Sequence, residues 1–174
     1  MKIEIRILDE SYAVAYMALR LYSYQEAPTA FSESYEDECK RTVDEYGTEL
    51  RPQGAPVEVF ALGAFTSTGE LVGFVTFKRD RRWKARHKAM IHAMYVHPEY
   101  RQHHVGAALM KEIIDRARAM PGLEQMHLWV LHGDAPASGF YKKAGFESQG
   151  TLVKNDLKIN GQYVDAEYMV MYLG

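Results

Sequence analysis

The chain has 174 residues, of which 47% are hydrophobic and 25% are charged, and its formal net charge is -2. This balance is that of one globular domain over residues 1–174, and it excludes a disordered chain and a strongly basic binder of nucleic acid. The single cysteine, Cys39, excludes an internal disulfide and favours a reducing cytoplasm. The start lacks the apolar block of a signal peptide and no run reaches the roughly 18 apolar residues that span a bilayer, so we expect neither export nor membrane insertion.

The first third of the chain predicts a strand and two helices. Residues 2–7 alternate isoleucine with charged side chains, which is the period of a short half-buried strand. Asp9 is placed to cap a helix over residues 10–24. A second helix is predicted over residues 34–46, with a capping box at its start and Gly47 as its C-terminal stop.

The middle of the chain predicts an antiparallel hairpin followed by a central strand. Residues 57–65 and 71–77 are rich in branched and aromatic side chains and form the hairpin. The next run, residues 78–88, is dense in lysine and arginine. A nucleic-acid patch is one interpretation of it, but charge on a solvated hairpin tip is normal, and we favour the tip. Residues 89–97 predict a strand buried on both faces, which Pro98 ends.

A helix over residues 105–119 follows the central strand. Its apolar stripe is formed by Val105, Leu109, Ile113 and, on the flank, Ala117. Residues 126–131 then predict another buried strand. A strand, helix, strand order of this length implies a parallel pair joined by a right-handed crossover.

The end of the chain predicts one more helix and a hairpin. Asp134 is the expected N-cap of a helix over residues 134–144. The pair Asn160-Gly161 separates residues 151–159 from residues 162–173 and is a strong hairpin signal. The predicted fold is α/β: a mixed sheet with antiparallel strands at its N- and C-terminal ends, one central parallel pair, and helices on both faces.

The turn after the central strand has the pattern of an anion site. It runs from Arg101 to Gly106, and the helix that follows opens on the small residues Gly106, Ala107 and Ala108. The N-terminus of such a helix leaves backbone N–H groups unpaired and attracts phosphate. We therefore expect a pyrophosphate to bind here.

Together with Leu128-Trp129-Val130 and residues 140–146, this turn resembles the GNAT superfamily of N-acetyltransferases. The resemblance covers nearly the whole chain in element order, and its specific part is residues 94–146. It implies a GNAT-like fold, acetyl-CoA as the co-substrate, and acetyl transfer to a primary amine by direct attack through a tetrahedral intermediate. A non-catalytic module that binds or senses coenzyme A is the alternative.

In that family the phosphate turn has Arg or Gln, two residues, Gly, one residue, and then Gly or Ala. His104 stands where the first glycine is usual. Either the backbone keeps the family's path and carries the imidazole outward, or the turn is distorted and binds coenzyme A weakly. We favour the first, because a left-handed non-glycine residue costs only about 1 kcal/mol. The resemblance assigns the pyrophosphate to Arg101, Gln102, His103, His104, Val105, Gly106 and Ala107.

The resemblance assigns the pantetheine arm to the strand segment Met94, Tyr95 and Val96, whose backbone would pair with it like an added strand. An amide there would stabilise the oxyanion, an effect typically worth about 3 kcal/mol. Tyr141 falls where many members carry a tyrosine that protonates the departing thiolate; a core aromatic residue is the alternative. Asp134 falls where the family often has Asn near the coenzyme A arm, although its role as a helix cap also explains it.

A general base is harder to assign, because residues 89–97 contain no carboxylate. By strand alternation His92 shares a face with Met94 and Val96, and a histidine titrates near neutrality. A structural histidine of the core is the alternative for that residue. Glu33, in the connection that would border the acceptor side, is the other candidate.

Acidic residues in the same region favour a cationic acceptor such as a polyamine or a basic peptide, although an exposed helix face explains them equally well. These residues are Glu26, Glu33, Glu36, Asp37 and Glu38. We expect no metal site, since the adjacent residues His103 and His104 rarely ligate one ion and lack a suitably spaced carboxylate. The expected partners are a coenzyme A thioester and a small amine or peptide amine, and a homodimer is compatible with the resemblance.

Overall fold

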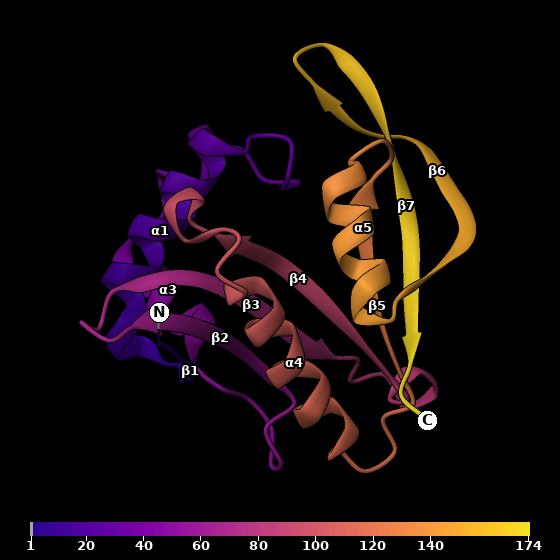
Figure 1. The fold of residues 1–174 in the computed structure, drawn as a ribbon, viewed down its shortest axis with the longest axis horizontal. Helices are drawn as coiled ribbons and strands as arrows, with labels where there is room; N and C mark the ends of the chain where they lie inside the picture. The colour runs from indigo at the N-terminus through magenta and orange to yellow at the C-terminus, as the bar shows by residue number, and fades with distance from the viewer. Residues whose placement is uncertain (1) are drawn as a thin grey trace.

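A computed structural model describes residues 2–174 and has one seven-stranded sheet at its centre, in the order β1-β2-β3-β4-β5-β7-β6 (Figure 1). The strands are β1 (Ile3–Leu8), β2 (Val59–Thr66), β3 (Leu71–Arg79), β4 (Lys88–Val96), β5 (Gln125–Leu131), β6 (Glu147–Ile159) and β7 (Gln162–Tyr172). All neighbours are antiparallel except β4 and β5, which are parallel. The mixed α/β fold with one central parallel pair is therefore confirmed.

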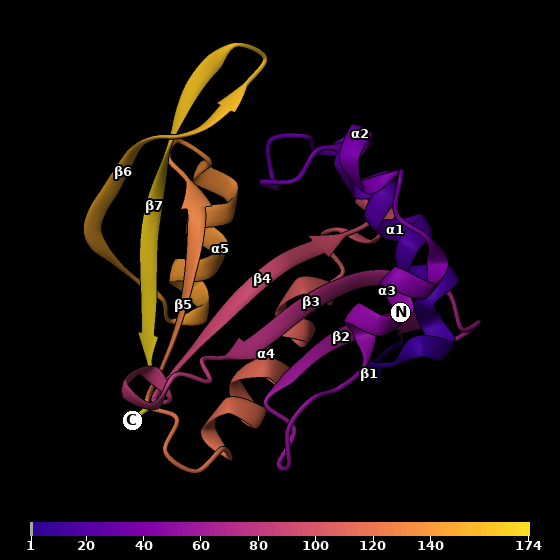
Figure 2. The same cartoon turned by 180° about the vertical axis from the view of Figure 1, so that it is seen from behind.

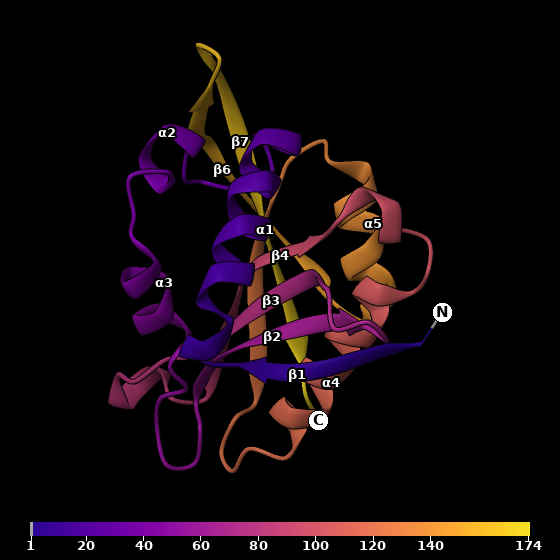
Figure 3. The ribbon, with the colours of Figure 1, turned by 90° about the vertical axis from the view of Figure 1, so that its left-hand side faces the viewer.

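The helices lie on both faces of this sheet, as Figure 3 shows. They are α1 (Ala13–Glu26), α2 (Tyr35–Glu38), α3 (Val43–Leu50), α4 (Val105–Arg118) and α5 (Ala135–Ala144), and the short 3₁₀ turns are η1 (Glu10–Tyr12), η2 (Trp83–Ala85) and η3 (Pro98–Tyr100). The first three helices cover one face, and α4 and α5 cover the other. Each face has its own hydrophobic core, which for the α4 face includes Phe77, Leu109, Ile113, Met126 and Phe146. The core under α1 includes Leu8, Tyr16, Tyr46, Phe65 and Phe74.

Local sequence signals predicted most of the second half of the chain correctly. All four residues of the predicted α4 stripe are buried. Asp134 caps α5 by accepting a hydrogen bond from the Ala137 backbone N–H at 3.0 Å. Asn160 and Gly161 have φ values of 50° and 81°, so the pair makes the tight turn between β6 and β7 that their sequence predicts.

The single helix predicted over residues 34–46 is wrong. Ser34 caps only the four-residue helix α2, and a new helix, α3, begins after Thr42. Thr42 and Glu45 form a complete capping box, which restarts the helix at Val43. Gly47 is not a stop but lies inside α3, where a Cβ would be 3.5 Å from the Cβ of Glu10. A side chain would be in ordinary contact there, so α3 packs against the start of the first helical segment at this position.

The parallel pair is short, and the two halves of the sheet diverge beyond it. The ladder joins only residues 88–90 of β4 to residues 125–127 of β5. Past that point the strands separate, and β7 pairs with the other edge of β5 (Figure 2). In the part of the chain that the structure describes, residues 91–96 have no partner strand on the β5 side.

A bulge in β4 changes which side chains face which core. Thr76 pairs with His92 and Phe74 pairs with Tyr95. Between these two pairs the chain advances three residues along β4 but only two along β3, so β4 contains one extra residue. Ala93, inside the bulge, has a positive φ of 46°. The extra residue reverses the side-chain alternation of the strand from this point on.

Among residues 2–174, no helix has the length and apolar character needed to cross a membrane.

Candidate active site

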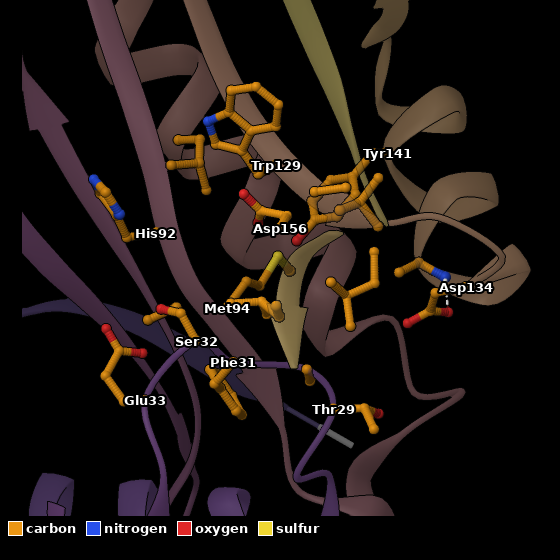
Figure 4. A pocket seen from close by; sticks show the side chains of 18 of the residues that line it. Thr29, Phe31, Ser32, Glu33, His92, Met94, Trp129, Asp134, Tyr141 and Asp156 are labelled. Atoms are coloured by element: carbon orange, nitrogen blue, oxygen red, sulfur yellow. Dashed lines mark hydrogen bonds between the residues drawn. The ribbon is translucent and has the colours of Figure 1, made fainter. Parts of the chain in front are cut away.

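The opening between β4 and β5 forms a cleft of about 430 Å³. Its walls come from the connection between α1 and α2, from β4 and β5, from α5, and from β6 and β7 (Figure 4). The lining includes Phe31, Ser32, Glu33, His92, Met94, Trp129, Asp134, Tyr141 and Asp156. Side chains from both faces of the sheet thus reach one cavity, because the missing pairing between the strands leaves a passage through it.

Tyr141 and Met94 lie on the α5 side of this cleft. The Tyr141 side chain comes from α5 and points into the cavity beside Met94 (Figure 4). Burial raises the pKa of the Tyr141 phenol to about 12, and the charge of Asp134 acts in the same direction. A phenol with this pKa carries its proton at neutral pH and can give it to a strongly basic leaving group.

The turn before α4 has an open helix N-terminus. His104 is the N-cap residue, with φ 60° and ψ 14°, and its side chain makes no capping hydrogen bond. The imidazole is exposed, and α4 begins without a break at Val105. His104 thus takes the left-handed conformation that glycine adopts most readily. The first N–H groups of this 14-residue helix remain available to an anion.

The helix start is also close to the cleft. A Cβ on Gly106 would lie 3.4 Å from the Met94 Cε and 3.5 Å from the Phe140 Cε2. These are ordinary contact distances, so the first turn of α4 lies directly against β4 and α5. An extended ligand with an anionic end at α4 would reach the cleft beside Met94.

The Arg101 side chain is used inside the protein. Its guanidinium contacts the Glu26 carboxylate at 3.1 and 2.6 Å and donates a hydrogen bond to the Val96 carbonyl at 3.1 Å. The hydrogen bonds from Arg101 lower the pKa of Glu26, and burial opposes them by raising it. The Tyr95 hydroxyl donates to the same carboxylate at 2.9 Å and lowers the pKa further. The guanidinium therefore fixes the turn to the ends of α1 and β4.

The expectation that His92 shares a face with Met94 and Val96 is wrong. Met94 and Val96 pack against the α4 core. His92 lies opposite Thr76, on the same face as Tyr95, whose ring packs in the α1 core. The bulge at Ala93 causes the change. His92 nevertheless lines the cleft, from the α1 side.

The surroundings of His92 favour its neutral form. Although the residue is exposed to solvent in the cleft, desolvation lowers the pKa of its imidazole, Lys78 lowers it further, and Glu33 opposes both. Figure 4 shows His92 and Glu33 together on the side of β4 away from Tyr141. A neutral imidazole on this side can accept a proton from an incoming ammonium.

The structure brings five of the predicted residues to the cleft: Glu33, His92, Met94, Asp134 and Tyr141. Tyr95 turns its ring into the α1 core, and residues 101–107 lie outside the cleft lining at the start of α4. Sequence reasoning missed Phe31, Ser32, Trp129 and Asp156 as cleft residues. Alternation could have found Trp129, since it lies between the buried residues Leu128 and Val130 and points to the opposite face. Nothing local marks the other three.

Within residues 2–174, no group of three or more His, Cys, Asp or Glu side chains is arranged so that it could hold a metal ion.

The cleft residues point to a defined chemistry. A protonated phenol lies on one side, a neutral imidazole on the other, and an unpaired strand edge runs between them. An unpaired edge can hold an extended ligand through backbone hydrogen bonds, and its amides can stabilise an oxyanion. The arrangement suits the transfer of a group from an extended anionic donor to an acceptor that enters from the α1 side.

Residues 20–146 match the model of the acetyltransferase (GNAT) family. The L-amino acid N-acetyltransferase AaaT of Escherichia coli is 37% identical over 101 residues, which cover 58% of this chain and 61% of that protein. The L-methionine sulfoximine/L-methionine sulfone acetyltransferase of Pseudomonas aeruginosa is 29% identical over 121 residues, covering 70% of this chain and 67% of that protein. The match thus spans about three fifths of the length of the E. coli relative.

Solved structures share the fold over nearly the full chain. A GNAT-family acetyltransferase from Streptococcus pneumoniae superposes with a TM-score of 0.83 at 22% identity, covering 99% of this chain and 100% of that one. The yncA protein of Salmonella typhimurium, described as an acetyltransferase and solved with its cofactor acetyl-CoA, has a TM-score of 0.79 at 18% identity, covering 100% and 95%. At such identities the likeness concerns the fold alone.

Proposed function

The chain belongs to the acetyltransferase (GNAT) family, and we propose that it transfers an acetyl group from acetyl-CoA to the primary amine of a small acceptor. The observation that carries this proposal is the divergence of β4 from β5. It leaves an unpaired strand edge, with Tyr141 in the same cleft. The structure solved with acetyl-CoA has the same fold, which supports acetyl-CoA as the co-substrate.

In this proposal the donor extends from α4 into the cleft. The open N–H groups at the start of α4 hold the pyrophosphate, and Arg101 positions their turn rather than contacting the phosphate. Residues 94–96 pair with the pantetheine arm through their free edge. The close approach of Gly106 to Met94 joins these two parts of the site.

The chemical step needs one acid and one base. The amine nitrogen attacks the thioester carbon to form a C–N bond, and the negative charge passes to the carbonyl oxygen, where a β4 amide stabilises it. Collapse of this tetrahedral intermediate breaks the C–S bond, and Tyr141 gives its proton to the departing sulfur. His92, directly or through water, takes the proton that the amine loses, and Glu33 supports the charge that the imidazole gains.

The acceptor is small and not strongly cationic in this proposal. Most of the acidic residues that favoured a polyamine or basic peptide are occupied: Glu26 by Arg101, Asp37 by Lys40, and Glu38 by Arg41. Their field is therefore largely neutralised. The names of the relatives, an L-amino acid N-acetyltransferase and a methionine sulfoximine/sulfone acetyltransferase, make amino acids the first acceptors to test.

A nucleic-acid role for residues 78–88 has little support. Arg79 pairs with Glu58 at 2.9 Å, and Arg82 pairs with Asp80 at 2.5 Å. The arginines of this hairpin tip are thus partly neutralised by their own neighbours. With Cys39 as a single free cysteine, we place the reaction in the reducing cytoplasm.

Thiol release from acetyl-CoA tests the proposed function. The protein is supplied with acetyl-CoA and, one at a time, with L-amino acids, amino-acid amides, alkylamines and polyamines, and the product is identified by mass spectrometry. We expect amine-dependent thiol release and an N-acetylated product. Binding of acetyl-CoA without thiol release on any amine would support the non-catalytic coenzyme A module instead.

A further inference from the structure

Arg20, on α1, buries a guanidinium among aromatic rings. The residue is 4% exposed. Its Cζ lies 4.7 Å from the ring centre of Tyr24, 5.2 Å from that of Phe31, 5.3 Å from that of Phe74 and 6.0 Å from that of Tyr16. Contacts between a cation and aromatic rings return only part of the cost of removing a charge from water.

This guanidinium lacks an anionic partner in the described part of the chain. Its Nη2 donates to the Tyr24 hydroxyl, but no residue between 2 and 174 accepts a hydrogen bond from Nε or Nη1. Folded proteins rarely leave buried donors unpaired, and a buried guanidinium normally has a carboxylate. The unpaired nitrogens therefore call for an acceptor that the chain itself does not provide.

Arg41 shows the usual arrangement in the same region of the molecule. Its Cζ lies 4.3 Å from the ring centre of Tyr46. Unlike Arg20, it also pairs with Glu38 at 3.0 Å and with Glu49 at 2.6 Å. Each arginine thus lies against at least one aromatic ring, but only Arg41 has carboxylate partners, which makes Arg41 a matched control.

Phe31 connects the Arg20 guanidinium to the cleft. The ring contacts the guanidinium at 5.2 Å, and the same residue lines the cleft beside Ser32 and Glu33. Phe31 belongs to the connection between α1 and α2. Between residues 27 and 33 a single backbone hydrogen bond is formed, in which the Ala30 N–H donates to the Ala27 carbonyl. A segment held by so few hydrogen bonds can shift at low cost, and a small movement of Phe31 would open Arg20 to the cleft.

We propose that Arg20 binds the carboxylate of the acceptor, so that the acceptor class is free amino acids rather than simple amines. This rests on the proposed function, since it names the acceptor of the same cleft. The carboxylate accepts hydrogen bonds from the unpaired guanidinium as Phe31 moves aside. The amine of the same molecule then lies toward His92 and the strand edge, where acetyl transfer takes place.

Direct binding tests the proposal without turnover. L-leucine and L-leucinamide, which differ in the carboxylate, are titrated calorimetrically into the wild-type chain, Arg20→Met and Arg41→Met in the presence of coenzyme A. We expect the wild type and Arg41→Met to bind L-leucine about 10- to 100-fold more tightly than the amide, the usual value of a charge-assisted hydrogen bond. Arg20→Met should lose this difference.

Equal affinity of the wild-type chain for acid and amide would overturn the proposal, and so would a preference that survives in Arg20→Met. The methionine variant is expected to fold, because an apolar residue of similar length suits an aromatic core and removes a buried charge. If it does not fold, Phe31→Ala provides the test. Opening the path to Arg20 should tighten binding of L-leucine but not of L-leucinamide, and equal effects on both would refute the carboxylate role.

Turnover of the same pair separates this inference from the proposed function. If the chain binds L-leucine more tightly than the amide but releases no thiol, the carboxylate role of Arg20 is supported and the proposed acetyltransferase activity is refuted. If acid and amide are acetylated with the same KM, the activity is supported and the carboxylate role of Arg20 is refuted. In Arg20→Met we expect a higher KM for L-leucine with little change in kcat, since the guanidinium does not touch the reacting atoms.

Discussion

The Glu26 carboxylate holds the Arg101 guanidinium at 3.1 and 2.6 Å and joins the last residue of α1 to the turn before α4. Tyr95 donates its hydroxyl to the same carboxylate, and Arg101 reaches the Val96 carbonyl. The end of α1 thus meets the end of β4 and the turn that follows β4 at one ion pair. Since the guanidinium is occupied by Glu26, its part in cofactor binding is to position the turn.

This positioning role predicts the same defect from either side of the pair. Glu26→Gln and Arg101→Gln should each raise the KM for acetyl-CoA by about 3- to 10-fold, the effect of losing a partly exposed ion pair with its hydrogen bonds. The double variant should be no worse than either single one, because the two residues act as a unit. A direct contact between Arg101 and phosphate predicts otherwise: Arg101→Gln would weaken binding, whereas Glu26→Gln would leave it unchanged or improve it.

His104→Gly should preserve or improve acetyl-CoA binding. His104 already has a left-handed backbone, so glycine relieves a strain of about 1 kcal/mol while adding a similar entropy cost to folding. His104→Val should raise the KM for acetyl-CoA and lower the melting temperature, because a β-branched residue fits this conformation poorly. Gln102→Gly, at φ 64°, is the matched control for glycine in the same turn. A glycine variant that loses acetyl-CoA affinity would show that the imidazole itself binds the cofactor.

Patterns that depend on near neighbours in sequence predicted their elements well. The stripe from Val105 to Ala117, the Asp134 cap and the Asn160-Gly161 turn each follow from contacts within one element or one hairpin. The error in the second helix was also local. The sequence contains two helix starts, one at Ser34 and one at the Thr42 capping box, whereas the predicted helix has only the first.

Features that depend on tertiary contacts could not be read in this way. The positive φ of Ala93 carries no sequence signal, because alanine is not a residue that favours it. The bulge it creates moved His92 to the other face. Arg20 and Glu26 both lie on one helix, and nothing in the pattern of that helix shows that one lacks a partner and the other holds Arg101.

Tyr141→Phe should lower kcat about 100-fold or more while changing the KM for acetyl-CoA little, because it removes the proton for the thiolate but keeps the ring. Since burial holds the pKa of Tyr141 at about 12, we expect no loss of activity from its ionisation below pH 10. Tyr16→Phe is the control: burial also raises the pKa of Tyr16 to about 12, but its ring lies in the α1 core, outside the cleft lining. Full activity in Tyr141→Phe would remove the assigned acid.

The acid limb of the pH profile should report His92. Desolvation and Lys78 lower the pKa of His92 from 6.5, so kcat/KM should fall only as the pH drops below about 6.5 and the imidazole becomes protonated. Glu33 raises this pKa, and Glu33→Gln should therefore move the limb to lower pH. In His92→Gln the limb should disappear, with kcat/KM reduced about 10-fold or more at pH 7.5. An unchanged acid limb in that variant would exclude His92 as the base.

The central claim is that acetyl-CoA occupies the opening between β4 and β5 with its pyrophosphate at the start of α4. Hydrogen exchange followed by mass spectrometry, with and without acetyl-CoA, tests it most directly. We predict new protection in residues 91–96 and 102–108 and none in residues 81–87 at the hairpin tip. Protection confined to other segments would contradict the account. So would an unchanged exchange rate in residues 91–96 when acetyl-CoA is bound.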